Sequence, residues 1–304
     1  MFSGKPVYYI DRKTNTKKKE AIYGDTVLSL LYAHNPLSRW FSYIVAHLTL
    51  ISTFYGFWQK TPFSKKKIIP FISKYSLDTS EFAQPPESFT SFNDFFCRKL
   101  KEGARPQSIS PEVVIAPADG RYLVIPQIAK ANGFYIKGKK FSLATLLQDS
   151  TLADEYAEGA MVIARLCPTD YHRFHFPVEG LPDKAKLING PLWSVNPLAT
   201  IKNVTFLAEN KRAITLLQNE RFGPIIYIEV GATNVGSIHQ TYRPHIFVQK
   251  GEEKGFFSFG GSCIILLFKP DTLQFDQDLL ANSDQHIETL VLMGDSLGRC
   301  ESTI

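Results

Sequence analysis

The feature that most constrains the fold is a series of short apolar runs after residue 111. Gly, Pro and Asn divide these runs, which are rich in β-branched and aromatic residues: VVIAP, RYLVIP, MVIARL, AITLLQ, IIYIEV, HIFVQ and CIILLF. Runs of this length between turn residues are typical of strands. We therefore expect residues 111–304 to form a β-rich domain, built as an antiparallel sandwich or a barrel-like fold.

The first 110 residues have a different pattern, with fewer strand-like runs and more helical character. A short strand followed by a charged turn is expected from YYIDRKT onward. Helices are expected over three segments, residues 26–34, 40–59 and 92–100. The chain is thus predicted to be α+β, with a mainly helical region and connector at residues 1–110 before the β-rich domain.

Positive charge is concentrated near the N-terminus. Residues 1–75 contain 12 Lys or Arg against 3 Asp or Glu, whereas the whole chain has 34 against 29. A basic segment joined to a mildly acidic body indicates an anionic partner, either nucleic acid or a membrane surface. The apolar residues beside these lysines favour the membrane and argue against nucleic acid.

Residues 40–59 carry no charged side chain and are long enough to span a bilayer. Their polar residues, however, fall on one helical face, opposite a face that carries Trp40, Ile44, Leu48, Ile51, Tyr55 and Trp58. An amphipathic helix with tryptophans near both ends is typical of a helix that lies in the membrane interface. Lysine runs at residues 17–19 and 65–67 would strengthen the binding. An ordinary core helix carries the same kind of stripe, so that interpretation stays open.

The four cysteines lie far apart and lack the Cys or Cys/His spacing of a metal site. We expect free, mostly buried thiols and no bound metal.

The stretch GDSLG, residues 294–298, matches the GxSxG pattern of serine hydrolases, with Ser296 as the nucleophile. An α/β-hydrolase takes its acid and its histidine from sequence after the serine. Only eight residues follow Ser296, and none is a histidine. A hydrolase that uses Ser296 is therefore the less favoured alternative.

Two histidines lie close together in DYHRFHFP, between Pro168 and Pro177. The prolines favour a turn, in which His172 and His175 would share a face, whereas in a strand they would point to opposite sides. Imidazoles are suited to proton transfer near neutral pH, although single histidines are more often structural. Asp119, in PADG, is better explained by a plain Asp-Gly turn while that motif is considered alone.

The stretch GFFSFGGSCIILLF places two glycines directly before a serine and a buried-strand run, although glycine weakens a strand interior. Together these stretches resemble the phosphatidylserine decarboxylase family, in the subgroup whose processing site reads Gly-Gly-Ser. The resemblance covers nearly the whole chain: YYIDRKT, SFNDFFCRKLKEGARP, PADG, DYHRFHFP, LWSVNP, EVGATNVGSI and KGEEKGFFSFGGS.

The resemblance implies a proenzyme that cuts itself between Gly261 and Ser262 and keeps both pieces as a heterodimer of α and β chains. Ser262 Oγ would attack the preceding carbonyl, through a bend that glycines allow because they lack Cβ. The resulting ester would undergo β-elimination to dehydroalanine, which hydrolyses to a pyruvoyl group and ammonia. This covalent pyruvoyl group would be the cofactor, an electrophile that takes the substrate amine and serves as the electron sink.

Residue roles follow from the same resemblance. Asp119 would orient and charge-stabilise His175, which would act as the base for Ser262 in self-cleavage. His172 would assist decarboxylation or reprotonation. One position departs from the family pattern, since Cys263 stands where a threonine is usual, and this leaves the efficiency of cleavage open.

The implied reaction converts phosphatidylserine to phosphatidylethanolamine and CO2. We expect a peripheral or monotopic protein on the cytoplasmic face of the cell (inner) membrane, bound to an anionic lipid surface. A membrane-binding homologue that has lost processing is the main alternative.

Overall fold

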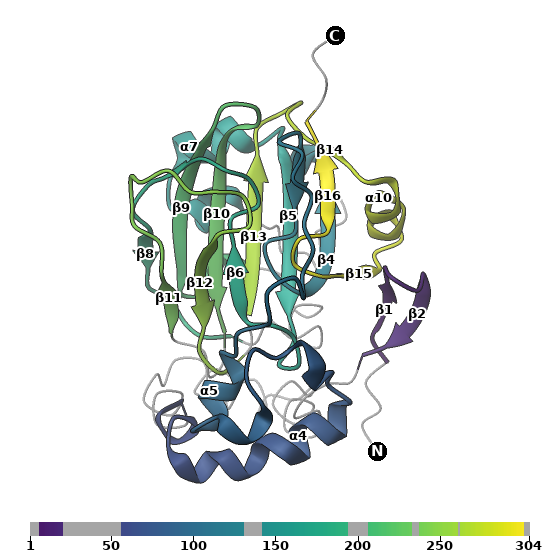
Figure 1. The fold of residues 1–304 in the computed structure, drawn as a ribbon. Coiled ribbons are helices and arrows are strands. Elements are labelled where there is room, and N and C mark those ends of the chain that lie inside the picture. The colour runs from purple at the N-terminus through teal and green to yellow at the C-terminus, as the bar shows by residue number, and fades with distance from the viewer. Residues whose placement is uncertain are drawn as a thin grey trace, which may run out of the picture.

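A mixed sheet of ten strands lies at the centre of the described part of the chain (Figure 1). The computed structural model describes residues 6–20, 56–130, 142–193, 206–232, 237–260 and 262–300. The strands follow one another in space as β2 (Thr16–Lys19), β1 (Tyr8–Asp11), β15 (Glu288–Val291), β4 (Gly120–Ile125), β5 (Ala160–Leu166), β13 (Ser262–Phe268), β10 (Gly223–Gly231), β9 (Arg212–Asn219) and β7 (Leu181–Pro182), and β8 (Lys186–Ile188) also pairs with β9. β1 and β15 are parallel, and the other neighbours are antiparallel.

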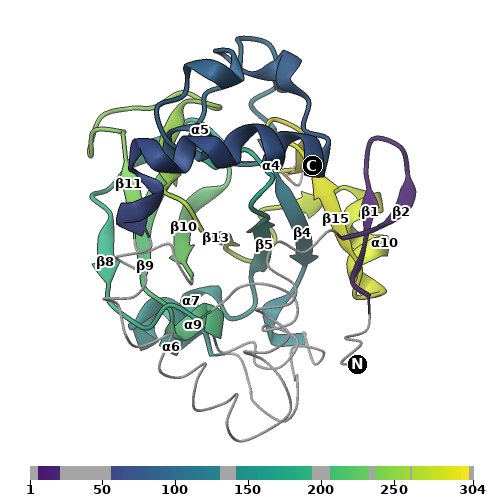
Figure 2. The same ribbon diagram turned by 90° about the horizontal axis from the view of Figure 1, so that it is seen from below.

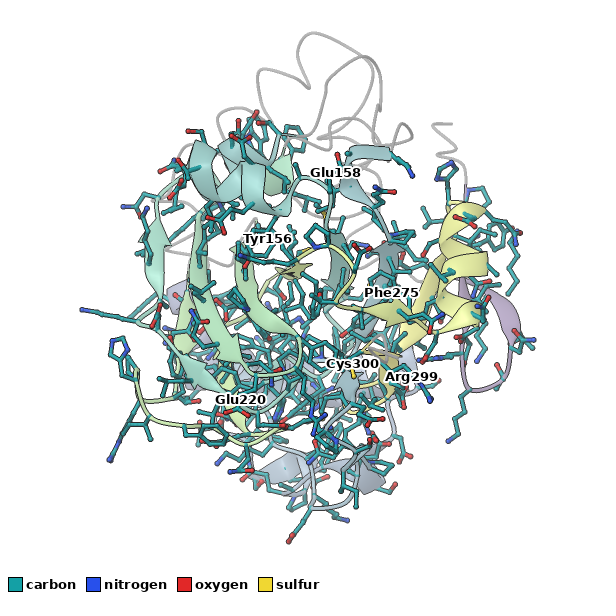
Figure 3. The ribbon with its side chains drawn as sticks, turned by 90° about the horizontal axis from the view of Figure 1, so that it is seen from above. Tyr156, Glu158, Glu220, Phe275, Arg299 and Cys300 are labelled. Carbon is teal, nitrogen blue, oxygen red and sulfur yellow. The ribbon has the colours of Figure 1, made fainter. Side chains whose placement is uncertain are left out.

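Two three-stranded sheets accompany the large one. The first contains β11 (Ile238–Gln240), β12 (Glu253–Phe257) and β6 (Arg173–His175), and the second contains β14 (Gln274–Phe275), β16 (Ser296–Arg299) and β3 (Val113–Ile115). Phe275 and Arg299 mark the second sheet in Figure 3, on the same side of the molecule. β12 and β13 are consecutive strands, yet they belong to different sheets, so the chain passes from one sheet to the other just before Ser262.

Both faces of β13 are buried, which explains its unbroken apolar sequence. Ile264, Leu266 and Phe268 join the cluster that contains Phe174 and Phe257 of the first small sheet. The alternate side chains Cys263, Ile265 and Leu267 join a second cluster with residues of three short helices, α6 (Leu143–Leu147), α7 (Ser150–Tyr156) and α9 (Phe206–Glu209). These helices cover one face of the sheet (Figure 2). Tyr156, at the end of α7, donates a hydrogen bond to the carbonyl of Pro224 at 2.6 Å (Figure 3).

The N-terminal helical segments lie across one end of the sheets (Figures 1 and 2). They are η1 (Pro62–Lys67), α4 (Ile68–Tyr75), η2 (Thr79–Glu81), η3 (Pro86–Ser88) and α5 (Phe92–Phe96). Elsewhere lie η4 (Ile128–Lys130) and α10 (Gln277–Asp284). The N-terminal segments share a third buried cluster made mainly of phenylalanines, and it includes Phe259 from the β12–β13 connection. This connection is therefore packed against the helical end.

The α+β class and the β-rich second part are confirmed, and six of the seven expected strand runs contain strands. HIFVQ, residues 245–249, is wrong as a strand: His245 has a φ of 60°, and only Val248 forms an isolated bridge, to Gly180. The helix expected over residues 92–100 ends at Phe96.

The expected short strand and charged turn are present as β1 and the turn at residues 12–15, and the lysines 17–19 after the turn form the second strand of a hairpin with β1. The expected helix over residues 26–34 lies outside the described residues, as does most of the one over 40–59, of which residues 56–59 are described and helical. The boundary near residue 110 stays a prediction. Of the helices that the structure describes, none has the length and apolar content of a bilayer span.

Candidate active site

Ser262 is the first residue of β13 and is fully buried. Among the described residues, no hydrogen-bond partner reaches its hydroxyl oxygen. A buried hydroxyl without a partner is costly, so it usually indicates a functional requirement. Two residues earlier, Gly260 has a φ of 145°, a conformation that is open mainly to glycine. The Gly-Gly-Ser stretch thus contains a backbone position that needs glycine and a hydroxyl that is held without a partner.

The register of the sheet brings the PADG stretch to the same end as Ser262. Arg121 of β4 is paired with Arg165 of β5, which in turn is paired with Cys263 of β13. Adjacent strands are about 4.8 Å apart, so the two outer backbones are separated by roughly 10 Å. Asp119 immediately precedes β4 and therefore lies at the end of the sheet where β13 begins.

Asp119 is buried and its carboxylate is fully engaged. Arg105 donates to it from Nη2 at 2.7 Å and from Nε at 2.9 Å, and the backbone N–H of Met293 donates at 2.8 Å. Arg105 also forms an ion pair with Glu81 at 2.9 Å. The carboxylate is thus held by a bidentate guanidinium and by the segment that precedes GDSLG, which excludes the simple turn as its full explanation.

His175 ends β6 and carries a defined tautomer. Its Nδ1 lies 2.9 Å from the carbonyl oxygen of Gly251, which can only accept, so Nδ1 carries the proton and Nε2 the lone pair. The hydroxyl of Tyr171 lies 3.3 Å from Nε2 and donates to it. Burial lowers the pKa of His175, so the neutral form that can act as a base is favoured.

His172 lies just before β6 and has no exposed surface. Its Nδ1 donates to the carbonyl of Asp170 at 3.0 Å, and within the described residues its Nε2 has no partner. The ring packs on Phe96 of α5, with 3.8 Å between centroids. Burial lowers the pKa of His172 to about 4, so the imidazole is neutral at physiological pH with a free lone pair.

The four predicted site residues therefore lie toward one end of the sheets, but no hydrogen bond links them. Asp119 bonds to Arg105 and not to His175, although the charges of Glu253 and, to a smaller extent, Asp119 favour the protonated form of His175. The backbone of His175 donates to Pro117 of the PADG stretch at 2.8 Å. His172 lies in the irregular stretch between the turn at residues 168–170 and β6, and His175 is the last residue of β6, so the pair adopts neither of the two expected arrangements in full.

Cys263 points away from Ser262, because successive strand residues face opposite sides of a sheet. It is fully buried in the second apolar cluster, and burial raises the pKa of its thiol to about 12. The thiol is thus a packed apolar side chain, with no contact to the hydroxyl of Ser262.

Ser296 begins β16 and is paired with Ile115 of β3. Its carbonyl accepts a hydrogen bond from Arg12. GDSLG therefore forms part of a small sheet, and the residue before it helps to hold Asp119.

Sequence reasoning did not single out Arg105, Tyr171 or Phe96. All three lie inside the quoted motifs, but only the fold brings them to Asp119, His175 and His172. Over the part of the chain that the structure describes, no three His, Cys, Asp or Glu side chains are grouped so that they could hold a metal ion.

A buried serine hydroxyl and two neutral imidazoles at one end of an α+β fold form the kind of site that enzymes use for proton transfer and nucleophilic attack. Comparison with known proteins identifies the family. The phosphatidylserine decarboxylase family model matches residues 92–299. A phosphatidylserine decarboxylase proenzyme of Chlamydia pneumoniae is 48% identical over 293 residues, 96% of this chain and 97% of that protein.

Proteins with the same description from Chlamydia felis and Chlamydia muridarum are 46% and 47% identical, over 97% and 96% of this chain and 98% and 96% of their own lengths. The chain belongs to the phosphatidylserine decarboxylase family and is an enzyme.

Proposed function

We propose that this enzyme cuts itself between Gly261 and Ser262 and then decarboxylates phosphatidylserine to phosphatidylethanolamine. The observation that carries the proposal is the buried hydroxyl of Ser262, which has no partner among the described residues and lies two positions after Gly260, whose φ is 145°. Self-cleavage gives this hydroxyl a purpose, since Oγ must be free to attack the carbonyl before it.

In the cleavage step, Oγ of Ser262 bonds to the carbonyl carbon of Gly261, and the C–N bond between the two residues breaks. The hydroxyl proton passes to a base, and the released nitrogen takes a proton, which leaves an ester. Nε2 of His175 is the candidate base, because its lone pair is fixed by the bond from Nδ1 to Gly251. Tyr171 must give up its contact with that lone pair for the proton to transfer.

Asp119 supports this step through charge. Its carboxylate, held by Arg105, favours the protonated form of His175, which appears when the proton is taken up. The geometry supports an electrostatic role for Asp119 more directly than a hydrogen bond to His175.

The residue at position 262 is suited to become a pyruvoyl group, because its hydroxyl has no competing partner among the described residues and is free to form the ester. β-Elimination would leave that oxygen on the new carboxylate of Gly261, and hydrolysis of the dehydroalanine would turn the former Cα into the ketone carbon and release ammonia. When formed, the group supplies an electrophilic ketone and an electron sink for decarboxylation. His172 handles a proton in that reaction: Nε2 takes one from the substrate ammonium and returns it to the carbon that has lost CO2. Its lowered pKa keeps Nε2 unprotonated before substrate arrives.

A lipid substrate agrees with the surface of the helical end. Phe57, Phe63 and Ile69 are 67%, 77% and 53% exposed, close in sequence to the lysines at 65–67. Apolar side chains beside lysines fit an anionic lipid surface. We place the enzyme as a peripheral or monotopic protein on the cytoplasmic face of the cell membrane, with its two chains associated after cleavage.

Intact-mass measurement of the purified protein tests the proposal. We expect one chain that ends at Gly261 and a second, residues 262–304, that has no free N-terminal amine and resists Edman sequencing until it is reductively aminated. Ser262→Ala should remain a single chain. An active enzyme with an uncut chain, or with a normal serine at the new N-terminus, would contradict the proposal.

A further inference from the structure

The helix α5 contacts the segment that leads into the cleavage site. Oδ1 of Asn93 accepts a hydrogen bond from the backbone N–H of Phe259 at 2.9 Å, three residues before Ser262. The ring of Phe259 lies 5.2 Å from Phe92 and 5.0 Å from Phe96, both in edge-to-face geometry. Asn93 thus restrains the backbone at this point.

The same helix and the residues that follow it contact the loop that carries His172. Phe96 packs on the ring of His172 at 3.8 Å, and Nη2 of Arg98 donates to the carbonyl of Asp170 at 3.3 Å. That carbonyl also accepts the hydrogen bond from His172 Nδ1. One short helical segment therefore packs against both the turn before Ser262 and the histidine assigned to decarboxylation.

We infer that Asn93 is a positioning residue for self-cleavage, which holds the bend at residues 259–260 (the cleavage turn) and thereby orients the chain that leads into the scissile bond. The inference rests on the self-cleavage proposed above. Two consecutive glycines have unusually wide conformational freedom, so the attack geometry must be imposed from outside the Gly-Gly pair. The bond to the N–H of Phe259 restrains the chain immediately before the glycines, and misplacement by about 1 Å can slow a reaction about 100-fold.

The acceptor oxygen, rather than the size of the side chain, should matter at position 93. Asn93→Asp keeps an oxygen that can accept from the N–H of Phe259, whereas Asn93→Leu has similar volume and no acceptor. Ser91→Ala is the matched control. Ser91 caps the same helix, since its Oγ accepts from the N–H of Asp94 at 3.1 Å, but it does not bond to the cleavage turn. Loss of such a cap weakens a helix without changing the bond to Phe259.

The experiment follows the conversion of the full-length chain into its two products after pulse labelling in cell-free synthesis. We expect Asn93→Leu to lower the first-order rate constant of cleavage by about 10-fold or more. Asn93→Asp should stay within about threefold of the parent, because the hydrogen bond is retained. Ser91→Ala should cut at the parental rate. Its melting temperature should nevertheless fall, and this is measured in the Ser262→Ala background so that every chain is uncut.

Each other outcome overturns the inference. Parental cleavage in Asn93→Leu would show that the contact does not position the turn. Equal slowing in Asn93→Asp would exclude the acceptor oxygen as the cause, and equal slowing in Ser91→Ala would assign the effect to helix stability. If Asn93→Leu lacks a cooperative melting transition, Asn93→Ala replaces it with the same expectation. A parent chain that never cuts would instead overturn the proposed function, and this inference with it.

Discussion

Arg105 and Asp119 form a bidentate ion pair, with Nη2 of the guanidinium 2.7 Å from one carboxylate oxygen, and both side chains are largely buried. The arginine lies between α5 and β3, and the aspartate immediately precedes β4. The pair therefore joins two separate segments of the chain at the candidate active site.

Arg105→Gln should both destabilise the fold and slow self-cleavage. It leaves the buried carboxylate of Asp119 without its cation, a change that typically costs about 3–5 kcal/mol. Denaturant unfolding of proteins that also carry Ser262→Ala measures the change in the free energy of unfolding on uncut chains. Arg12→Gln is the control: Arg12 pairs with Asp276 and Asp278 at a more exposed site, where loss of an ion pair should cost about 1 kcal/mol or less. Equal losses in both variants would contradict the importance of the buried pair.

Substitution of each of the two histidines should affect a different step, either self-cleavage or lipid turnover. His175→Ala and Asp119→Ala should leave a largely uncut chain over hours, because a positioned base contributes about 100- to 10,000-fold. His172→Ala should cut and form pyruvoyl but turn over lipid slowly. Gel analysis and product formed per mole of pyruvoyl measure the two steps. If His172→Ala blocks cleavage while His175→Ala cuts, the roles are reversed.

The low pKa of His172 predicts a specific pH dependence of stability. The folded pKa is about 4, whereas the ordinary value is about 6.5. As the pH falls from about 6.5 to about 4, the imidazole of His172 therefore becomes protonated in the unfolded chain but stays neutral in the folded chain. Over that window the free energy of unfolding should drop by about 3 kcal/mol through this residue alone.

Comparison of His172→Gln with the parent, both carrying Ser262→Ala, isolates the contribution. Urea unfolding at several pH values should give a shallower pH dependence for the glutamine variant. Identical slopes would mean that the buried imidazole does not hold its low pKa.

A buried ion pair between Lys254 of β12 and Glu229 of β10 gives a further stability prediction. Nζ of Lys254 donates to Glu229 at 2.5 Å, to Gln240 at 2.9 Å and to Thr215 at 3.0 Å. Burial lowers the pKa of Lys254 and raises that of Glu229. Lys254→Met should cost about 3–5 kcal/mol because it leaves the carboxylate without its cation, and a combined Lys254→Met and Glu229→Leu variant should recover most of it. Unfolding curves of the two single variants and the double variant measure this recovery. If the stability losses of the single variants simply add in the double variant, the prediction is contradicted.

Association with vesicles tests the exposed aromatic surface. Replacement of Phe63 and Ile69 by Asp should weaken binding to anionic vesicles and leave self-cleavage intact. Ile109→Asp is the control, since Ile109 is 94% exposed but lies in the connection before β3. High salt should weaken the binding of the parent without abolishing it, because only the lysine contribution is screened. Unchanged vesicle binding in the double variant would remove this surface as the lipid contact.

The strands were predictable because β-branched and aromatic runs bounded by glycine or proline have few alternatives, as CIILLF and IIYIEV illustrate. HIFVQ has the same composition, but the left-handed backbone at His245 ends any extended run there. The parallel pairing of β1 with β15 could not be predicted, because it joins segments from opposite ends of the chain.

The motifs predicted the candidate acid, imidazoles and serine, but not their hydrogen-bond partners. A buried carboxylate requires a cation, and only the fold selects Arg105 among the many basic residues of the N-terminal half. The same applies to Tyr171, whose contact with His175 depends on where β6 begins.

The central place of β13 has a consequence for the lifetime of the processed enzyme. Ser262–Phe268 is hydrogen-bonded to β5 on one side and to β10 on the other, and both neighbours precede the cut. The shorter chain would thus be interleaved between strands of the longer one and could leave only if the sheet opened. Under the proposed self-cleavage, folding would precede the cut, and after denaturation the two pieces would have to find each other as separate molecules. Processing would then make the persistence of the fold depend on its rate of unfolding.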